Sequence, residues 1–469
     1  FYDFVVQVAI VRPGPIQGGM VHPYLERRAL RERGELPPSP YPALDAALGR
    51  TLGVPIFQEQ VMQICVIAAG FTPGEADGLR RSMAAWRKKG ELHVFHDRIV
   101  QGMVQRGYPK DFAQGIFRQI EGFGEYGFPE SHAYSFALLS YVSAWMKCHE
   151  PEAFLAALLN SQPMGFYAPS QLVQDARRHG VDVRPVDVCF SDWDCTLEAG
   201  ALNAQTMALT AAQTTAPTTT QPPTRPAVRL GLRMVSGLSA ALAQAVVRAR
   251  QQQPFSDLQD LAQRASLSAA DLQCLARADA LQGLSGHRRQ QLWQASGVQR
   301  PAHRASAMGD LFDEIPAPEA VQPRLDPAPE GQAITQDYAS TGLSLRRHPL
   351  ALMRPRLRGR GWLNAHELQD WPDGRRAWAC GLVTMRQQPS TAKGTTFITL
   401  EDETGCINVI VWRQIREQQR LAVLQARLLA VAGQWQNRNG VRHLVARRLL
   451  DVSPWLGDLG HVTASRDFR

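Results

Sequence analysis

The residues most able to do chemistry are four cations gathered in one short stretch near the N-terminus. On an expected helix, Arg80, Arg81, Arg87 and Lys88 fall on one side, around the small residue Ala84. Cations that converge in this way indicate a seat for a polyanion such as a triphosphate. The same spacing also describes an ordinary solvated helix face, and the periodicity alone does not separate the two interpretations.

The start of this basic helix is marked by residues 72–75 (TPGE). Thr72 suits the N-cap, Pro73 suits the first helical position, and Glu75 stands where a carboxylate reaches back to the cap. The apolar residues of the helix lie on the adjoining side and are Leu79, Met83 and Trp86. We therefore expect a capped helix that packs on one side and presents its cations on the other.

Two further segments of the first third are candidates for ligand contact. Arg12 opens the turn RPGPIQGG (residues 12–19), whose glycines let a backbone approach a ligand closely. Arg12 is a phosphate or base contact on one interpretation and an ordinary loop arginine on the other. Residues 122–131 combine glycines and aromatics before an apolar helix at 132–149 that Ser131 is expected to cap. This loop either stacks bases and holds phosphate, or is a helix–helix corner.

Composition and charge limit the class of protein. The chain has 469 residues and a formal net charge of +8, and all of the excess lies in residues 340–469, where 20 Lys and Arg face 10 Asp and Glu. This bias predicts a polyanionic partner for the last third. The seven cysteines are scattered, which predicts reduced thiols in a cytoplasmic protein and no metal site. No apolar run is long enough for a membrane span and no leader opens the chain.

The middle of the chain contains a possible DNA-binding hairpin. Residues 235–238 (VSGL) lead into a helix, and residues 280–284 repeat the pattern loosely. In a helix-hairpin-helix such a glycine turn offers backbone N–H groups to a DNA phosphate, so Ser236 and Gly237 are the expected contacts. The Thr- and Ala-rich residues 201–227 are expected to be a flexible insertion.

Residues 291–336 are predicted to be a linker because they are rich in Pro, Ala and Glu. Within them, residues 308–312 (MGDLF) have the composition of a peptide that docks into a partner's groove, or that tethers to its own domain. A connector is expected at residues 337–375.

The strand pattern in the last third of the chain predicts a β-barrel. Strands are expected at 376–386, 395–401, 406–412, 427–434 and 441–452, with a helix at 413–421 after the third. This is the element order of the five-stranded OB-fold, placed at 376–455 and followed by a tail at 456–469. Phe397, Trp412, Trp435 and Arg438 suggest single-stranded nucleic acid as its ligand, with protein contacts as the alternative. The chain is therefore expected to be a multidomain α+β protein: mostly helical over 1–165, a helix-hairpin-helix region over 166–290, then the barrel.

Three motifs resemble the fingers of bacterial C-family DNA polymerases, a family that includes the DNA polymerase III alpha subunit. They are RPGPIQGGMVHPYLERR (12–28), IFQEQVMQICVIAAGFTPGEADGLRRSM (56–83) and the segment 122–160 that begins GFGEYGF. Residues 337–357 and the ending SRDFR (465–469) are similar to the error-prone, DnaE-type lesion-bypass branch of the family, the ImuC type.

The resemblance implies nucleotidyl transfer, in which a primer hydroxyl attacks an incoming deoxynucleoside triphosphate on primer–template DNA. Two Mg²⁺ ions held by palm aspartates would support that step, and the palm is expected upstream of Phe1. We therefore expect a piece of a longer polymerase, with no catalytic residue and no metal ligand of its own. By resemblance, Arg12, Arg80 and Arg81 contact the nucleotide phosphates.

Departures from the replicative pattern favour the bypass branch. Residues 84–90 replace a more lysine-rich segment, and Pro129 stands at a position where replicative relatives carry a cation-containing loop. The peptide at 308–312 lacks the leading Gln of a clamp-binding motif, so direct sliding-clamp binding is expected to be weak or absent. The chain ends soon after the barrel, which favours recruitment by accessory bypass proteins. The rival interpretations are a replicative alpha subunit and a non-catalytic nucleic-acid-binding adaptor.

Overall fold

The computed structural model describes most of the chain: residues 1–12, 15–16, 18–83, 92–122, 129–164, 167–199, 225–298, 323–389, 392, 394–438, 440–459 and 466–468. The chain divides into two compact units, Phe1–Cys148 and His149–Arg469, and each is described by itself. No helix within these described ranges has the length and apolar character needed to cross a membrane.

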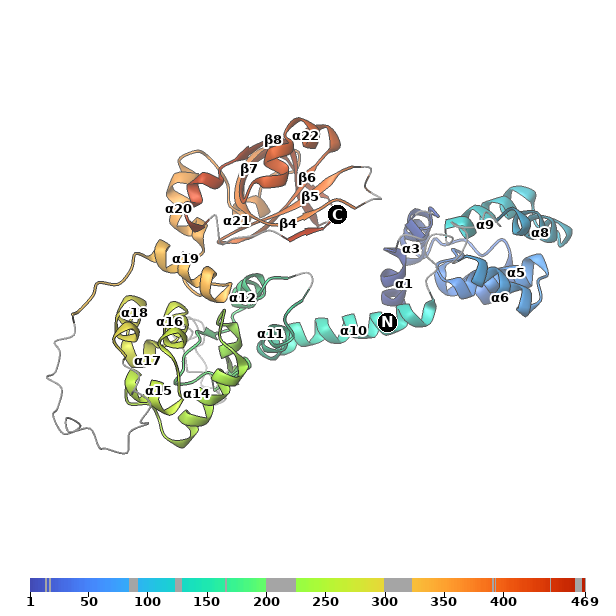
Figure 1. The fold of residues 1–469 in the computed structure, drawn as a ribbon. Helices are drawn as coiled ribbons and strands as arrows, with labels where there is room; N and C mark the ends of the chain where they lie inside the picture. Colours follow the sequence, from blue (N-terminus) through green and yellow to red (C-terminus); the bar gives the residue numbers. More distant parts are fainter. Residues whose placement is uncertain are drawn as a thin grey trace, which may run out of the picture. The chain divides into compact units, whose positions relative to one another are not determined.

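The first unit is built from helices, as predicted (Figure 1). The helices are α1 (Tyr2–Ile10), α3 (Val21–Glu32), α4 (Asp45–Leu48), α5 (Gln58–Ala69), α6 (Pro73–Met83), α8 (Leu92–Gln105), α9 (Lys110–Gly122) and α10 (Glu130–His149), with short 3-10 turns at Pro42–Leu44 and Gly49–Thr51.

The core of this unit lies where α5 packs against α6 and α8. Ile64 of α5, Leu79 of α6 and Met103 of α8 are fully buried there. Gly102 allows the close crossing, because a Cβ at this position would lie 2.4 Å from the carbonyl oxygen of Ala69. The capped basic helix α6 is thus fixed on its apolar side by α5.

A buried glutamine organises the turn that leads into α5. The Gln60 side chain accepts hydrogen bonds from the N–H groups of Ile56 and Phe57, at 2.8 and 3.0 Å. Its amide donates to Ala47 O at 2.9 Å and to Thr51 Oγ1 at 2.7 Å. Because every polar atom of this buried side chain is paired, it adds specificity without the cost of an unmet hydrogen bond.

Helix α10 differs from the expectation at its start. It begins at Glu130 rather than after Ser131, so Ser131 lies inside the helix and is not its N-cap. The N–H of Glu130 donates to Glu59 Oε2 of α5 at 3.0 Å. A carboxylate at this end is favourable because the first helical N–H groups carry partial positive charge.

The second unit begins with a helical part around a small sheet (Figure 1). Strand β3 (Ala227–Arg229) pairs parallel with β1 (Val183–Arg184) and antiparallel with β2 (Thr196–Glu198). The helices here are α11 (Pro151–Asn160), α12 (Pro169–Arg178), α14 (Ala240–Gln252), α15 (Leu258–Arg264), α16 (Ala269–Arg277), α17 (Gln282–Ser285) and α18 (Arg288–Gly297). Most of the segment 201–227 lies outside the described residues, but its last residue starts β3.

The segment predicted to be a linker contains parts of two helices. Helix α18 runs to Gly297, and α19 (Glu330–Thr341) begins inside the Pro-rich stretch. The peptide at 308–312 lies outside the described residues. Helices α20 (Pro349–Arg358) and α21 (Ala365–Gln369) follow in the connector.

The last part is a closed five-stranded barrel with the predicted element order. Its strands are β4 (Arg376–Gln387), β5 (Thr396–Asp402), β6 (Gly405–Val411), β7 (Leu428–Arg438) and β8 (Val441–Asp451), with α22 (Arg413–Gln418) and α23 (Arg420–Gln425) after the third strand. The sheet order is β5-β6-β8-β7-β4, and pairing of β4 with β5 closes it. A further strand, β9 (Arg466–Phe468), pairs parallel with the end of β4.

Candidate nucleotide and DNA interfaces

The start of α6 has the reciprocal cap that its sequence predicts. The N–H of Thr72 donates to Glu75 Oε2 at 2.8 Å, and the N–H of Glu75 donates to Thr72 Oγ1 at 3.3 Å. Arg98 of α8 also bonds Glu75. The N–H of Thr72, followed by the Arg98 guanidinium, lowers the pKa of Glu75 to about 2. Helix α6 is thereby fixed at its first turn as well as along its apolar side.

The two arginines of α6 share one acidic partner. Arg80 donates from Nε to Asp77 Oδ1 at 2.9 Å, and Arg81 Nη2 lies 3.1 Å from Asp77 Oδ2. The hydrogen bond from Arg80 lowers the pKa of Asp77. The side chains of Arg80 and Arg81 are 42% and 70% exposed, so both guanidinium groups remain open to a ligand. Asp77 is not among the residues predicted for this site, although its spacing of three and four residues from the arginines is a signal present in the sequence.

The other predicted nucleotide contacts are less fully described. Arg12 follows α1, is half-buried, and has its guanidinium carbon 5.8 Å from the ring centroid of Phe136 on α10. It therefore comes from a different element than Arg80 and Arg81. Arg87 and Lys88 lie outside the described residues.

The start of α10, next to the predicted glycine-aromatic loop, is engaged by side chains of the same unit. Residues 123–128 lie outside the described residues. At the start of α10, Glu59 already accepts from the N–H of Glu130, and Tyr2 Oη donates to Glu130 Oε1 at 2.8 Å. Arg50 Nη1 also lies 3.3 Å from Glu130 Oε1, so the charges at this helix end are partly paired within the protein.

The predicted helix-hairpin-helix turn is formed at residues 235–238. Gly237 has a φ of +87°, a left-handed conformation that favours glycine, and both Ser236 and Gly237 are exposed. The N–H of Ser236, however, donates to Ser340 O of α19 at 2.8 Å. Within the described part of the chain, no acceptor is recorded for the N–H of Gly237, so the glycine is the better placed donor for a phosphate.

The looser repeat at residues 280–284 does not form a second open turn. The N–H of Gly283 donates to Asp187 Oδ2 at 3.1 Å and is therefore already used. Its φ is not in the left-handed region. The backbone of this segment therefore differs from the Gly237 turn, and its fit to the hairpin pattern stays loose.

The barrel exposes three of its four predicted nucleic-acid residues. Phe397 on β5 and Trp412 after β6 are 39% and 54% exposed, and Arg438 is exposed at the end of β7. Phe397 is the cross-strand partner of Ile410, so Trp412, two residues further along, follows on the same outer face. Trp435 is 4% exposed within the barrel core, and its interpretation as a base-stacking residue is wrong.

The described residues offer no ligand set for a metal. No group of three or more His, Cys, Asp or Glu side chains comes together among them. The cysteines are all free thiols, and burial raises the pKa of Cys65 and of Cys380 to about 12, so neither is a reactive thiolate.

The geometry of α6 and of the Gly237 turn agrees with the families that the chain matches. Residues 1–107 match the bacterial DNA polymerase III alpha subunit finger domain, and residues 180–291 match a helix-hairpin-helix motif. The first range contains α6 and its arginines, and the second contains Ser236 and Gly237. The chain thus contains a polymerase III alpha finger domain followed by a helix-hairpin-helix domain.

Curated relatives match the chain from end to end. Error-prone DNA polymerases are 57% identical over 475 residues in Bordetella bronchiseptica, 56% over 470 in Methylococcus capsulatus and 54% over 470 in Alkalilimnicola ehrlichii. Each alignment covers 100% of this chain and 42–43% of the relative. The chain is homologous along its whole length to a part of the bacterial error-prone DNA polymerases.

Proposed function

We propose that this chain supplies the nucleotide-gripping fingers and the DNA-binding modules of an error-prone DNA polymerase that copies damaged templates. The observation that carries the proposal is identity of 54–57% to error-prone DNA polymerases along the entire chain. The reaction would be template-directed nucleotidyl transfer. The Mg²⁺-binding palm would come from the part of the relatives that this chain does not span.

In this proposal α6 grips the triphosphate of the incoming nucleotide. Arg80 and Arg81 project from a helix that is capped at Thr72, packed against α5 and joined to α8 by the pair between Glu75 and Arg98. Their shared partner Asp77 is a carboxylate that a phosphate can replace, because both anions accept two hydrogen bonds from guanidinium groups. Arg12, Arg87 and Lys88 would complete the cationic surface.

The second unit would hold DNA. The open N–H of Gly237 suits a duplex phosphate read without regard to sequence. Phe397 and Trp412 lie on the face of the second and third barrel strands, the face that OB-folds use for oligonucleotides, and Arg438 stands at the turn between the last two strands. Single-stranded template is therefore the proposed ligand of the barrel.

The partners follow from the same reasoning. Accessory bypass proteins would recruit the polymerase, since the peptide at 308–312 lacks the leading Gln of a clamp-binding motif and would hold a sliding clamp weakly or not at all. Because the substrate is chromosomal DNA of a bacterium, the proposed place of action is the cytoplasm.

Primer extension by the full-length polymerase containing this chain tests the nucleotide grip. With Arg81→Ala we expect the apparent KM for the incoming nucleotide to rise roughly ten-fold, because one charge-assisted contact to phosphate is lost. Arg118→Ala is the matched control, since Arg118 is exposed on α9 and its one hydrogen bond to a described residue is to Gln114 O of its own helix. An unchanged KM in Arg81→Ala, equal to the control, would remove α6 from the nucleotide site.

A further inference from the structure

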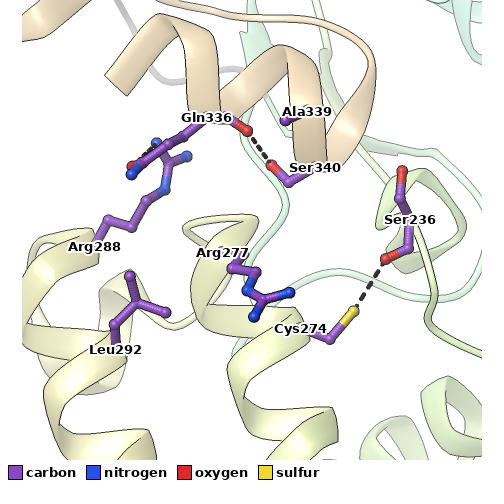
Figure 2. Close-up of a pocket in the computed structure, with 8 residues that line it drawn as sticks. All are labelled: Ser236, Cys274, Arg277, Arg288, Leu292, Gln336, Ala339 and Ser340. Carbon is purple, nitrogen blue, oxygen red and sulfur yellow. Dashed lines mark hydrogen bonds between the residues drawn. The ribbon is translucent and has the colours of Figure 1, made fainter. Parts of the chain in front are cut away.

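A cavity beside the Gly237 turn is lined by residues that could bind a second phosphate. Figure 2 shows this cavity of about 400 Å³, which is bordered by the turn at Ser236 and by side chains from α16, α18 and α19. Its lining includes two arginines, Arg277 of α16 and Arg288 of α18. The two have different roles.

Arg288 is occupied by the protein itself. Its guanidinium donates to Ala333 O at 3.0 Å and to Gln336 Oε1 at 3.4 Å, and it pairs with Asp337. These three partners lie on α19, and the arginine is 5% exposed. Arg288 therefore joins α18 to α19 and is not free to bind a ligand.

The guanidinium of Arg277, in contrast, has no hydrogen bond or ion pair with another described residue. It is exposed at the end of α16, and no carboxylate is recorded as its partner there. The nearest acid of its own helix, Asp271, accepts from Ser268 N at 2.8 Å and from the Ser268 hydroxyl at 2.5 Å as part of the helix cap. Among the residues that line the cavity, Arg277 is thus the cation without a carboxylate partner.

The same helix also holds the turn in place. Cys274, one turn before Arg277, donates from Sγ to Ser236 O at 3.0 Å, as Figure 2 shows. A Cβ on Gly237 would lie 3.6 Å from this sulfur. The open N–H of Gly237 and the guanidinium of Arg277 are therefore presented by two elements in direct contact.

We propose that Arg277 binds a backbone phosphate of duplex DNA next to the phosphate held by the Gly237 turn, and that the cavity between them receives the strand. This inference rests on the proposed function, because it assumes that the helix-hairpin-helix domain holds DNA. A phosphodiester supplies the acceptor oxygens that both donors require, and a neutral ligand would leave the Arg277 charge uncompensated.

Duplex binding by the whole chain tests the inference. Fluorescence anisotropy with a 20-base-pair duplex would be measured over a range of salt concentrations. For Arg277→Gln we expect roughly ten-fold weaker binding and a salt slope reduced by about one, because one phosphate contact is lost. We expect Arg277→Lys to keep the wild-type salt slope, because the positive charge remains. Arg178→Gln on α12 is the control, because it removes one exposed arginine outside the cavity. Arg277→Gln with wild-type affinity and slope overturns the proposal.

A variant of the turn separates this inference from the proposed function. Gly237→Ala strains the left-handed turn without a severe steric clash, and its folding would be checked by thermal unfolding. If Gly237→Ala weakens binding while Arg277→Gln does not, the hairpin holds DNA and the Arg277 contact is wrong. If neither variant changes binding, the DNA-binding role of this domain is wrong as well.

Discussion

On the basic side of α6, the carboxylate of Asp77 pairs with both arginines. Asp77 holds both Arg80 and Arg81 in the absence of a ligand, and it does so within one helix at spacings of three and four residues. It keeps two long side chains ordered, yet it also competes with a phosphate for them. Removing its charge should therefore tighten polyanion binding, in spite of the small loss of order.

Asp77→Asn should bind inorganic tripolyphosphate or a deoxynucleoside triphosphate roughly three-fold more tightly, since an exposed ion pair is weak and the two arginines would no longer be shared with a carboxylate. Isothermal titration with the whole chain measures the effect. Asp97→Asn on α8 removes the same charge from a residue that pairs with His96. Equal tightening in both variants would mean that only the net charge matters, and weaker binding by Asp77→Asn would mean that Asp77 assists the ligand.

At the scale of the element, two tryptophans of the barrel differ in burial and therefore in their expected roles. Trp412 is exposed after β6, whereas Trp435 of β7 is buried in the core. Trp412→Ala should therefore cost about 1–3 kcal/mol of single-strand binding with little change in unfolding temperature. Trp435→Phe, the control, should change binding little and lower the unfolding temperature instead. Single-strand anisotropy and thermal unfolding of both variants measure this, and intact binding in Trp412→Ala would favour protein contacts for the barrel.

These elements also show what the sequence could and could not predict. The strands, the helix α6 and its cap follow from local signals, namely alternation, turn residues and the spacing of Thr72 and Glu75. The burial of Trp435 and the use of the Ser236 N–H by Ser340 depend on partners far away in the chain, which no local pattern contains. The start of α10 was misplaced because Glu59, distant in sequence, takes the role expected of Ser131.

At the scale of the whole molecule, α19 joins the two parts of the second unit. Its Asp337 pairs with Arg288 of the helix-hairpin-helix part and lies 3.2 Å from Arg346 Nε, while Ile334 of the same helix packs in a cluster with barrel residues such as Leu428. A segment that its sequence assigned to a linker is thus a structural connection. Helix α19 thus contacts both the helix-hairpin-helix part and the barrel part of this unit.

Asp337→Asn should destabilise the second unit by about 3 kcal/mol, because Arg288 is buried and would lose its carboxylate partner. Since the chain forms two compact units, we expect two unfolding transitions in calorimetry, and only the one belonging to His149–Arg469 should move. Glu330→Gln, which breaks the ion pair with the exposed Arg347 at the other end of α19, should leave both transitions nearly unchanged. A shift of the first unit's transition, or no shift at all, would show that α19 does not carry the stability of this unit.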